Sequence, residues 1–234
     1  MKKPKTATEQ AYTGIVNLIL MANLRPGERT SVKLLADRLS LGRTPVKEAI
    51  TRLQTEGVFS VAGRSGTTVR AIDENEARQL FILRRTLEDL AAVEAVQRVK
   101  QSELENINRL LGELRKTSLG MRNNNPASAA DFVRWNVAFH AAIVSAAHNP
   151  FLDRLYSQIQ LQVQIVSYLI IRGENSAAAE MRQEEHASIV EALERRDAAL
   201  LRQRLRRHSE VTEKAILETL EANMSKRATE LGSN

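Results

Sequence analysis

The chain of 234 residues contains no cysteine, which excludes a disulfide framework and a thiolate metal site. Aromatic residues make up only 4% of it, and no apolar run reaches the length of a membrane-spanning helix or resembles a secretory signal. Phosphate-cradling glycine loops and serine-nucleophile elbows are also missing. We therefore expect a soluble, cytoplasmic protein that makes no contact with a membrane.

Positive charge is concentrated in the first third of the chain. The net charge is +6, but residues 1–72 hold 12 Lys or Arg against 5 Asp or Glu, a net of +7, and the remaining residues hold 22 against 23, a net of −1. Neutralising phosphates releases condensed counterions, so such an asymmetry favours a nucleic-acid partner for the N-terminal part. A solvated basic face that binds nothing has the same composition, and charge alone leaves both interpretations open.

The first 74 residues show the order of a winged helix-turn-helix. Apolar spacing predicts helices over 8–22 and 43–55, with a short helix capped by Ser31 between them. The segments 58–62 and 67–72 are rich in β-branched residues and are separated by a Gly-containing turn, which predicts a β-hairpin. Three helices followed by a hairpin are typical of a winged helix-turn-helix domain.

After Asp73 every strong pattern is helical, so the chain is predicted to be mainly α. Long helices joined by short loops pack antiparallel to bury their apolar stripes, which predicts a bundle of six to seven helices over residues 75–223. Residues 224–234 are expected to form a flexible tail. The predicted helices are 75–99, 101–122, 127–148, 150–171, 176–195 and 198–223.

The N-terminal domain offers a set of candidate DNA contacts. The second helix of a helix-turn-helix enters the major groove, where Arg43 can pair with guanine and Lys47 can reach a phosphate. A glycine in the hairpin lets the backbone approach the minor groove. Ordinary exposed cations would look the same one by one. The candidates are Lys33, Arg43, Thr44, Lys47, Arg64 and Gly66.

The histidines suggest a metal site in the second domain. Asn136 and His140 are four residues apart on one helical face, and His186 and His208 each lie 11 residues from Asp197. In an antiparallel helical hairpin, residues equidistant from the turn come side by side. Three imidazoles and an amide oxygen suit a divalent ion, with zinc preferred over nickel, iron or manganese. The alternative is that each histidine is a separate, hydrogen-bonded core residue.

Several of these residues together resemble the DNA-binding domain of GntR-family regulators. The family usually has Ser or Thr where this chain has Gly42, Val where it has Leu41 and Arg where it has Lys47, and losing the hydroxyl at Gly42 removes a helix cap and a phosphate contact. The resemblance rests on Leu24-Arg25-Pro26-Gly27-Glu28, Leu35-Ala36-Asp37-Arg38-Leu39, Arg43-Thr44-Pro45-Val46-Lys47-Glu48-Ala49-Ile50, Leu53, Glu56-Gly57 and Gly66.

The second domain resembles the metal-binding, ligand-sensing domain of the FadR-type subgroup of that family. This resemblance implies that Arg84 faces the cavity and pairs with an effector carboxylate; the alternative is an ion pair with Glu88 one turn away. Many relatives have Asp where this chain has Asn136, and an uncharged oxygen is a weaker ligand. The residues that carry the resemblance are Arg84-Arg85-Thr86-Leu87-Glu88, Asn136-Val137-Ala138-Phe139-His140, Asn149-Pro150-Phe151-Leu152, His186 and His208.

The function that follows is a homodimeric transcription regulator, most often a repressor in this family, that controls a metabolic operon. It binds double-stranded operator DNA and senses a small organic acid beside a divalent metal, and it is not expected to be an enzyme. A metal-dependent hydrolase or lyase is the competing class, since three histidines and a metal-bound water are also catalytic equipment. No general base lies at a spacing that fixes it beside the metal. A third class is an architectural DNA binder with a structural metal.

Overall fold

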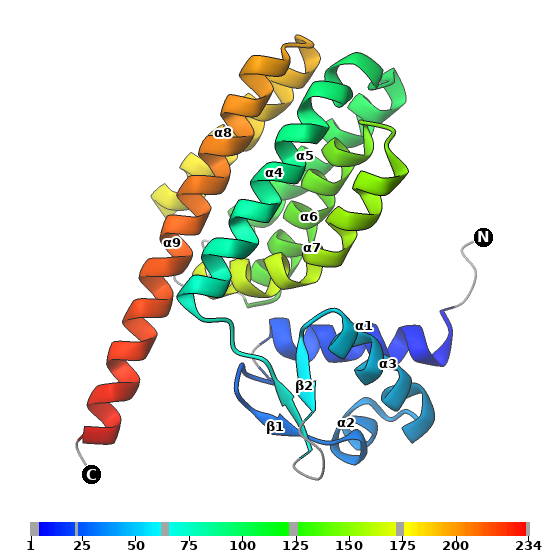
Figure 1. Cartoon of the computed structure of the whole chain (residues 1–234), viewed down its shortest axis with the longest axis vertical. Coiled ribbons are helices and arrows are strands. Elements are labelled where there is room, and N and C mark those ends of the chain that lie inside the picture. Colours follow the sequence, from blue (N-terminus) through cyan, green and yellow to red (C-terminus); the bar gives the residue numbers. More distant parts are fainter. Residues whose placement is uncertain (1–4, 22, 62–65, 122–125, 172–175, 233–234) are drawn as a thin grey trace. The chain divides into compact units, whose positions relative to one another are not determined.

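The chain forms two compact units, Met1–Ile72 and Asp73–Asn234, each described by itself below. The computed structural model, shown in Figure 1, describes residues 5–21, 23–61, 66–121, 126–171 and 176–232.

The first unit consists of helices packed on one another and on a small sheet. Helix α1 packs chiefly against α3, and α2 also packs against α3. Their shared core includes Ile15, Leu35 and Leu53, none of which is exposed to solvent. In chain order the elements are α1 (Ala7–Leu20), β1 (Arg29–Thr30), α2 (Val32–Leu39), α3 (Arg43–Thr55), β2 (Phe59–Val61) and β3 (Thr67–Val69).

Local signals set the turn between α2 and α3. The Oγ of Ser31 accepts a hydrogen bond from the backbone N–H of Leu34 at 3.1 Å, so the predicted cap starts α2. Ser40 then takes a left-handed conformation with φ of 53° and ends this helix. Gly42 precedes α3 without any side-chain cap, as its missing hydroxyl requires. Helix, tight turn and second helix follow directly from these residues.

The sheet has one strand that the sequence pattern did not predict. Its order is β1-β3-β2, and both neighbouring pairs are antiparallel. Thr30 of β1 is opposite Thr67, and Phe59 of β2 is opposite Val69. A strand of two residues is too short to show an alternating pattern, so β1 is defined only by its pairing with β3.

The second unit is a bundle of six helices among the described residues. Helix α4 packs mainly against α9, α5 against α6, and α6 against α7, while α8 packs against both α5 and α9. The fold class is therefore confirmed as mainly α, with an N-terminal helix-turn-helix and a helical C-terminal domain. The helices are α4 (Glu74–Arg98), α5 (Gln101–Met121), α6 (Pro126–Ser145), α7 (Pro150–Ile171), α8 (Ser176–Glu194) and α9 (Ala198–Gly232).

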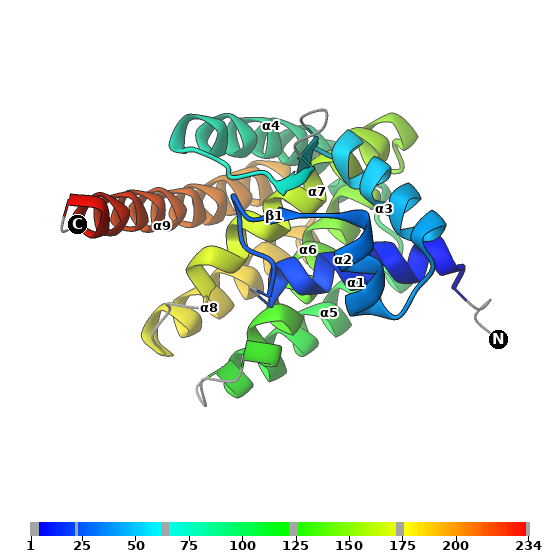
Figure 2. The ribbon, with the colours of Figure 1, turned by 90° about the horizontal axis from the view of Figure 1, so that it is seen from below.

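Helix α9 is the longest element of this bundle. Figures 1 and 2 both show its C-terminal part running beyond the ends of the other helices of the unit. It continues to Gly232 and so takes in most of residues 224–234, the segment expected to be a flexible tail. None of the helices, as far as their residues are described, combines the length and the apolar character needed to cross a membrane.

Helix α4 begins at a capping box. The Asp73 carboxylate accepts from the backbone N–H of Glu76 at 2.8 Å, and the Glu76 carboxylate accepts from the N–H of Asp73 at 3.3 Å. Two amides that the first turn leaves without helical partners are thereby satisfied. The cap thus stabilises the start of α4, the helix that carries Arg84 and Glu88.

Replacing the cap should weaken the second unit. Asp73→Ala removes the acceptor for the Glu76 amide and is expected to lower the free energy of unfolding by about 1 kcal/mol. Urea unfolding followed by the fluorescence of Trp135, the single tryptophan, measures this unit because Trp135 lies in α6. Asp73→Asn, which keeps an oxygen acceptor, is the matched control and should retain most of the stability. Equal stability of the alanine and wild-type proteins would contradict the assignment.

Candidate metal centre and ligand pocket

Three histidines from three helices meet inside the bundle. His140 of α6, His186 of α8 and His208 of α9 each offer a ligand atom, and these atoms lie within 4.8 Å of one another. The ring centroids are 4.5 Å apart for His186 and His208, and 5.0 Å for His140 and His208. All three side chains are buried. The structure thus brings together His186 and His208, which the spacing about Asp197 predicted to be neighbours, and adds His140 from α6.

Carboxylates on two neighbouring helices lie beside one ring nitrogen of His140 and one of His208. Nδ1 of His208 lies 2.9 Å from the Glu185 carboxylate, and Nδ1 of His140 lies 3.2 Å from Glu88. Both ring nitrogens of His140 and both of His186 are buried without a complete hydrogen bond. Buried nitrogens are normally partnered, so unpaired ones call for an explanation. A borderline divalent ion fits this donor set, because it accepts neutral imidazole nitrogens whose other nitrogen faces a carboxylate.

The surroundings keep the three imidazoles neutral. Burial lowers the pKa of His140 below its usual range, and the charge of Arg84 lowers it further. Burial also depresses the pKa of His186 and of His208 well below the usual value, and the neighbouring histidines add to this effect. A neutral imidazole is the form that binds metal, so no proton has to be displaced near neutral pH.

Two phenylalanine rings pack against the histidine cluster. Phe139 stands edge-on to His140 and to His186, with ring centroids 5.3 Å and 5.1 Å apart. Phe132 lies 6.5 Å from His186. Both phenylalanines are buried. The edge-on contacts are an arrangement that aromatic pairs prefer, so these rings help to hold the imidazoles in place.

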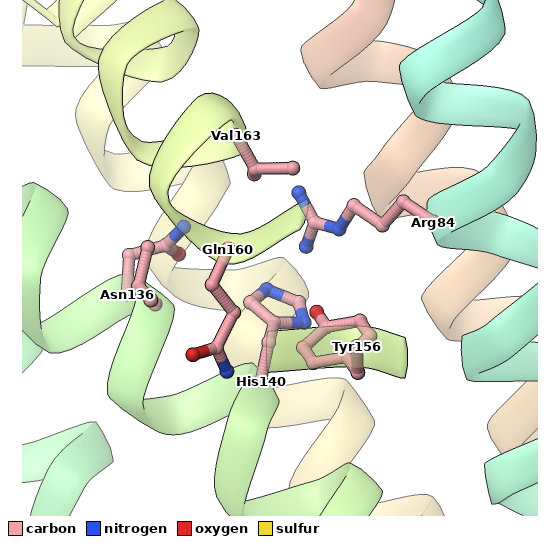
Figure 3. A pocket seen from close by; sticks show the side chains of 7 residues that line it. Arg84, Asn136, His140, Tyr156, Gln160 and Val163 are labelled. Atoms are coloured by element: carbon pink, nitrogen blue, oxygen red, sulfur yellow. The ribbon is translucent and has the colours of Figure 1, made fainter. Parts of the chain in front are cut away.

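A small cavity adjoins the cluster and is shown in Figure 3. Its volume is about 10 Å³, close to the space that a single water molecule needs. A ligand larger than water must therefore move side chains to enter. The lining residues are Arg84, Asn136, Val137, His140, Tyr156, Gln160 and Val163.

Arg84 is buried, with only 1% of it exposed, and only one of its three guanidinium nitrogens donates a hydrogen bond. Its Nε donates to Oε1 of Glu88 at 2.8 Å, while Nη1 and Nη2 are buried without partners. The ion pair with Glu88 that we considered as an alternative is therefore present. This ion pair does not involve Nη1 or Nη2, so it does not exclude the predicted role of Arg84 in binding an effector carboxylate.

Glu88 joins the arginine to the histidine cluster. Tyr156 also donates to Oε1 of Glu88, at 2.7 Å. Burial by itself raises the pKa of the Glu88 carboxyl, but the charge of Arg84 and its hydrogen bond to the carboxylate outweigh burial and lower this pKa to about 2. Glu88 is thus a carboxylate in a buried site, at the junction between the cavity and the imidazoles.

Asn136 lines the same cavity as His140 and Arg84. It is buried, and its Oδ1 has no hydrogen-bond partner. An amide oxygen is therefore free near the histidines, and its role as a fourth ligand stays a prediction. His148, which we did not assign to the cluster, lies beyond the end of α6 with Nε2 3.0 Å from Glu103.

Sequence reasoning did not reveal the contacts that three residues make in this site. We considered Glu88 only as a partner of Arg84, although it also approaches His140. Glu185 precedes His186 in the sequence but contacts His208, which only the pairing of α8 and α9 reveals. Tyr156 gave no signal at all, because an isolated tyrosine in an apolar helix resembles any packed aromatic residue.

In the first unit, the described candidate DNA contacts lie on the surface. Lys33 of α2 and Arg43, Thr44 and Lys47 of α3 are exposed. Gly66 has φ of +88°, and a Cβ there would lie 3.4 Å from the carbonyl oxygen of Thr30. Glycine is favoured at this position because of the positive φ, which side chains with a Cβ rarely adopt. The remaining candidate, Arg64, lies outside the described residues.

A helix-turn-helix unit followed in the same chain by a helical unit is the organisation of a two-domain transcription regulator. Residues 7–69 match the family described as bacterial regulatory proteins, gntR family, and residues 79–211 match the FCD domain. The chain therefore belongs to the GntR family of bacterial regulators, in the FadR-type subgroup that carries an FCD domain.

Individual proteins of this kind are similar along most of their length. The HTH-type transcriptional regulator YdhC of Bacillus subtilis is 24% identical over 208 residues, covering 89% of this chain and 90% of that protein. The probable D-xylose utilization operon transcriptional repressor of Paenarthrobacter nicotinovorans is 26% identical, covering 87% of this chain and 85% of that one. The solved structure of E. coli McbR/YncC has a TM-score of 0.79 at 22% identity, covering 92% of this chain and 99% of the other. The family and these relatives are transcriptional regulators and not enzymes.

Acid should destabilise the metal-stripped protein through the buried histidines. Histidines of the unfolded chain bind protons near pH 6.5, whereas the buried ones resist protonation because their pKa is lowered in the folded state. Protons therefore favour the unfolded chain. The free energy of unfolding should fall as the pH drops below about 6.5, by up to about 1.4 kcal/mol per pH unit for each histidine.

Urea unfolding at several pH values, followed by Trp135 fluorescence, measures this slope. His186→Gln removes one such group and should make the dependence on pH shallower by up to one proton. If the free energy of unfolding of this variant depends on pH as steeply as that of wild type, His186 has the same pKa in the folded and the unfolded chain, and the prediction is wrong.

Proposed function

We propose that this protein is a ligand-responsive, sequence-specific DNA-binding regulator, acting as a repressor of a metabolic operon. The observation that carries the proposal is the pair of unbonded Nη atoms of buried Arg84 beside three buried imidazoles. A domain attached to a helix-turn-helix has no structural need for such a polar interior. A relative named as a probable repressor of a sugar-utilization operon supports the sign and kind of regulation.

The three histidines would hold a divalent transition metal, for which zinc is the first candidate and nickel, iron and manganese are the others. His140, His186 and His208 supply neutral nitrogens, and Asn136 supplies an amide oxygen from the cavity wall. When bound, the ion would contribute positive charge and open coordination positions for a carboxylate. Asn136 adds no negative charge, which leaves more of the ion's charge for the ligand to neutralise.

The effector would be a small organic acid bound at Arg84. The guanidinium is planar and stays charged, and its two free Nη atoms match the two oxygens of a carboxylate. Glu88 already balances one positive charge, so an added metal makes the site cationic. Because the cavity holds about 10 Å³, the ligand must be small and must displace neighbouring side chains. That displacement would couple ligand binding to the packing of the bundle.

The N-terminal unit would read operator DNA. Arg43 and Thr44 start α3, where side chains of a recognition helix meet base edges. Lys33 and Lys47 are exposed and suit phosphate contacts. Gly66 begins the segment leading into β3 and lets the backbone come close to the minor groove. Arg64, which lies outside the described residues, stays a candidate from the sequence alone.

We infer that a homodimer places two such units on a pseudopalindromic site. The two units of the chain, residues 1–74 and 75–223 in the predicted division, would act as DNA-binding domain and as sensing and dimerisation domain. In one form of the dimer the spacing of the two DNA-binding domains would not match the operator. An effector that binds this form more tightly would lower operator affinity, by the difference between its binding free energies for the two forms.

Gel-shift titration on the DNA upstream of the protein's own gene tests this function. Arg43→Ala should weaken specific binding by about 1–3 kcal/mol, since a bidentate contact to guanine is lost. Arg195→Ala removes the same charge from an exposed residue of the second unit and should leave binding unchanged. Organic acids from a panel of hydroxy acids, sugar acids and dicarboxylates should release wild-type protein but not Arg84→Gln. A lack of retardation with and without metal would refute the proposal.

Metal content provides a test independent of DNA. Full-length protein purified without chelators should contain about one divalent ion per chain by elemental analysis, and removal with EDTA should lower its melting temperature because a ligand of the folded state is lost. His186→Ala should abolish both the bound ion and the effect of EDTA. His148→Ala, which changes a histidine outside the cluster, should behave like wild type. Metal-free wild-type protein that gains no stability from zinc, nickel, iron or manganese would exclude the metal site.

A further inference from the structure

A single carboxylate oxygen lies where the cavity and the histidine cluster meet. Oε1 of Glu88 accepts from Nε of Arg84 at 2.8 Å and from the hydroxyl of Tyr156 at 2.7 Å, and it lies 3.2 Å from Nδ1 of His140. Arg84, Glu88, Tyr156 and His140 are all buried. Three different side chains from α4, α6 and α7 thus converge on one atom.

This contact has a chemical consequence for His140. A neutral imidazole carries its proton on one nitrogen and its lone pair on the other, and the partner of one nitrogen selects the tautomer. An anionic oxygen next to Nδ1 keeps the proton there and leaves the lone pair on Nε2. Both ring nitrogens of His140 are buried and neither makes a complete hydrogen bond, but Nδ1 has the Oε1 of Glu88 at 3.2 Å, which leaves Nε2 as the nitrogen for an ion. His208 follows the same rule, since its Nδ1 lies 2.9 Å from Glu185.

We propose that Glu88 is a positioning residue of the metal centre, which holds His140 with its Nε2 lone pair toward His186 and His208, and that it ties this histidine to the ligand anchor Arg84. The inference rests on the proposed metal site. Glu88 is not itself a ligand, yet it decides whether the three imidazoles bind an ion tightly. Glu185 has the corresponding role for His208.

The competing explanation is that Glu88 serves only to neutralise Arg84. A buried arginine without a counter-ion is costly, and such a pair can often be replaced as a whole by apolar residues without loss of stability. A single substitution of Glu88 cannot separate the two explanations, because it leaves the charge of Arg84 stranded beside the metal. Both members of the pair must therefore change together.

Two double variants separate the explanations. Arg84→Met/Glu88→Leu and Arg84→Met/Glu88→Gln both leave the pair with a net charge of zero, as in wild type, so the long-range field at the metal is preserved. They differ at position 88 only, where Gln still offers an oxygen to Nδ1 of His140 and Leu offers none. The Gln variant is thus the matched control for the Leu variant.

Zinc alone is the probe, and its affinity for full-length, EDTA-stripped protein is measured by competition with a chromophoric chelator. We expect the Leu variant to bind zinc at least about tenfold more weakly than wild type, the usual effect of losing a hydrogen-bond partner behind a metal ligand. The Gln variant should stay close to wild type. A Leu variant that binds zinc as tightly as wild type would show that Glu88 only balances Arg84.

The protonation of the His140 ring gives a second readout, which a merely structural role would not move. Nitrogen-15 spectra of the stripped protein, with His140 assigned by its absence in His140→Ala, should place the proton on Nδ1 in wild type and in the Gln variant. The Leu variant should lose this preference. The same tautomer in all three proteins would overturn the proposal.

Two controls keep the outcomes distinct. If wild type binds no zinc, or binds it equally well after His186→Ala, the metal site itself is wrong and not the role of Glu88. Circular dichroism checks that the Leu variant retains the helix content of wild type. If it does not, Arg84→Met/Glu88→Met takes its place, because the flexible methionine side chain fills an irregular space and still offers no oxygen.

Discussion

Charged and polar groups inside a helical bundle must find partners there, and this constraint shapes the second unit. Arg84 and Glu88 are each only 1% exposed and balance one another one turn apart on α4. The charge pair alone does not satisfy all of their atoms, since Nη1 and Nη2 of Arg84 and Oε2 of Glu88 are buried without hydrogen-bond partners. Unpaired polar atoms in a low-dielectric interior destabilise the fold, so these atoms call for an explanation.

The same constraint links the two halves of the site. Glu88 contributes to the ion pair with Arg84 and lies beside His140, so the proposed anion-binding residue and the candidate metal ligand contact one oxygen. The helices that bring these groups together are also those that form the bundle core, with α4 packed against α6, α7 and α9. A change at the cavity therefore has a direct physical route into the packing of the unit.

The first unit follows a different principle, because its candidate functional groups are exposed and its structure depends on local signals. The Ser31 cap, the left-handed Ser40 and the uncapped Gly42 together set the turn between α2 and α3. Lys33, Arg43 and Lys47 stay in solvent, where they are available to a polyanion. Among the described elements of this unit, the short strand β1 was not predicted, since its two residues are defined as a strand by their pairing with β3.

Sequence alone determined the helices, the capped turns, the concentration of positive charge in the first third and the identity of the three histidines, because helical periodicity and residue chemistry are local properties. It also placed His186 and His208 as neighbours, since both lie 11 residues from the turn at Asp197. Tertiary structure decided what stands behind those residues. The contacts of Glu185 with His208 and of Tyr156 with Glu88 join residues 23 and 68 positions apart. Distances of this kind are set by how whole helices pack, and no spacing within a single helix encodes them.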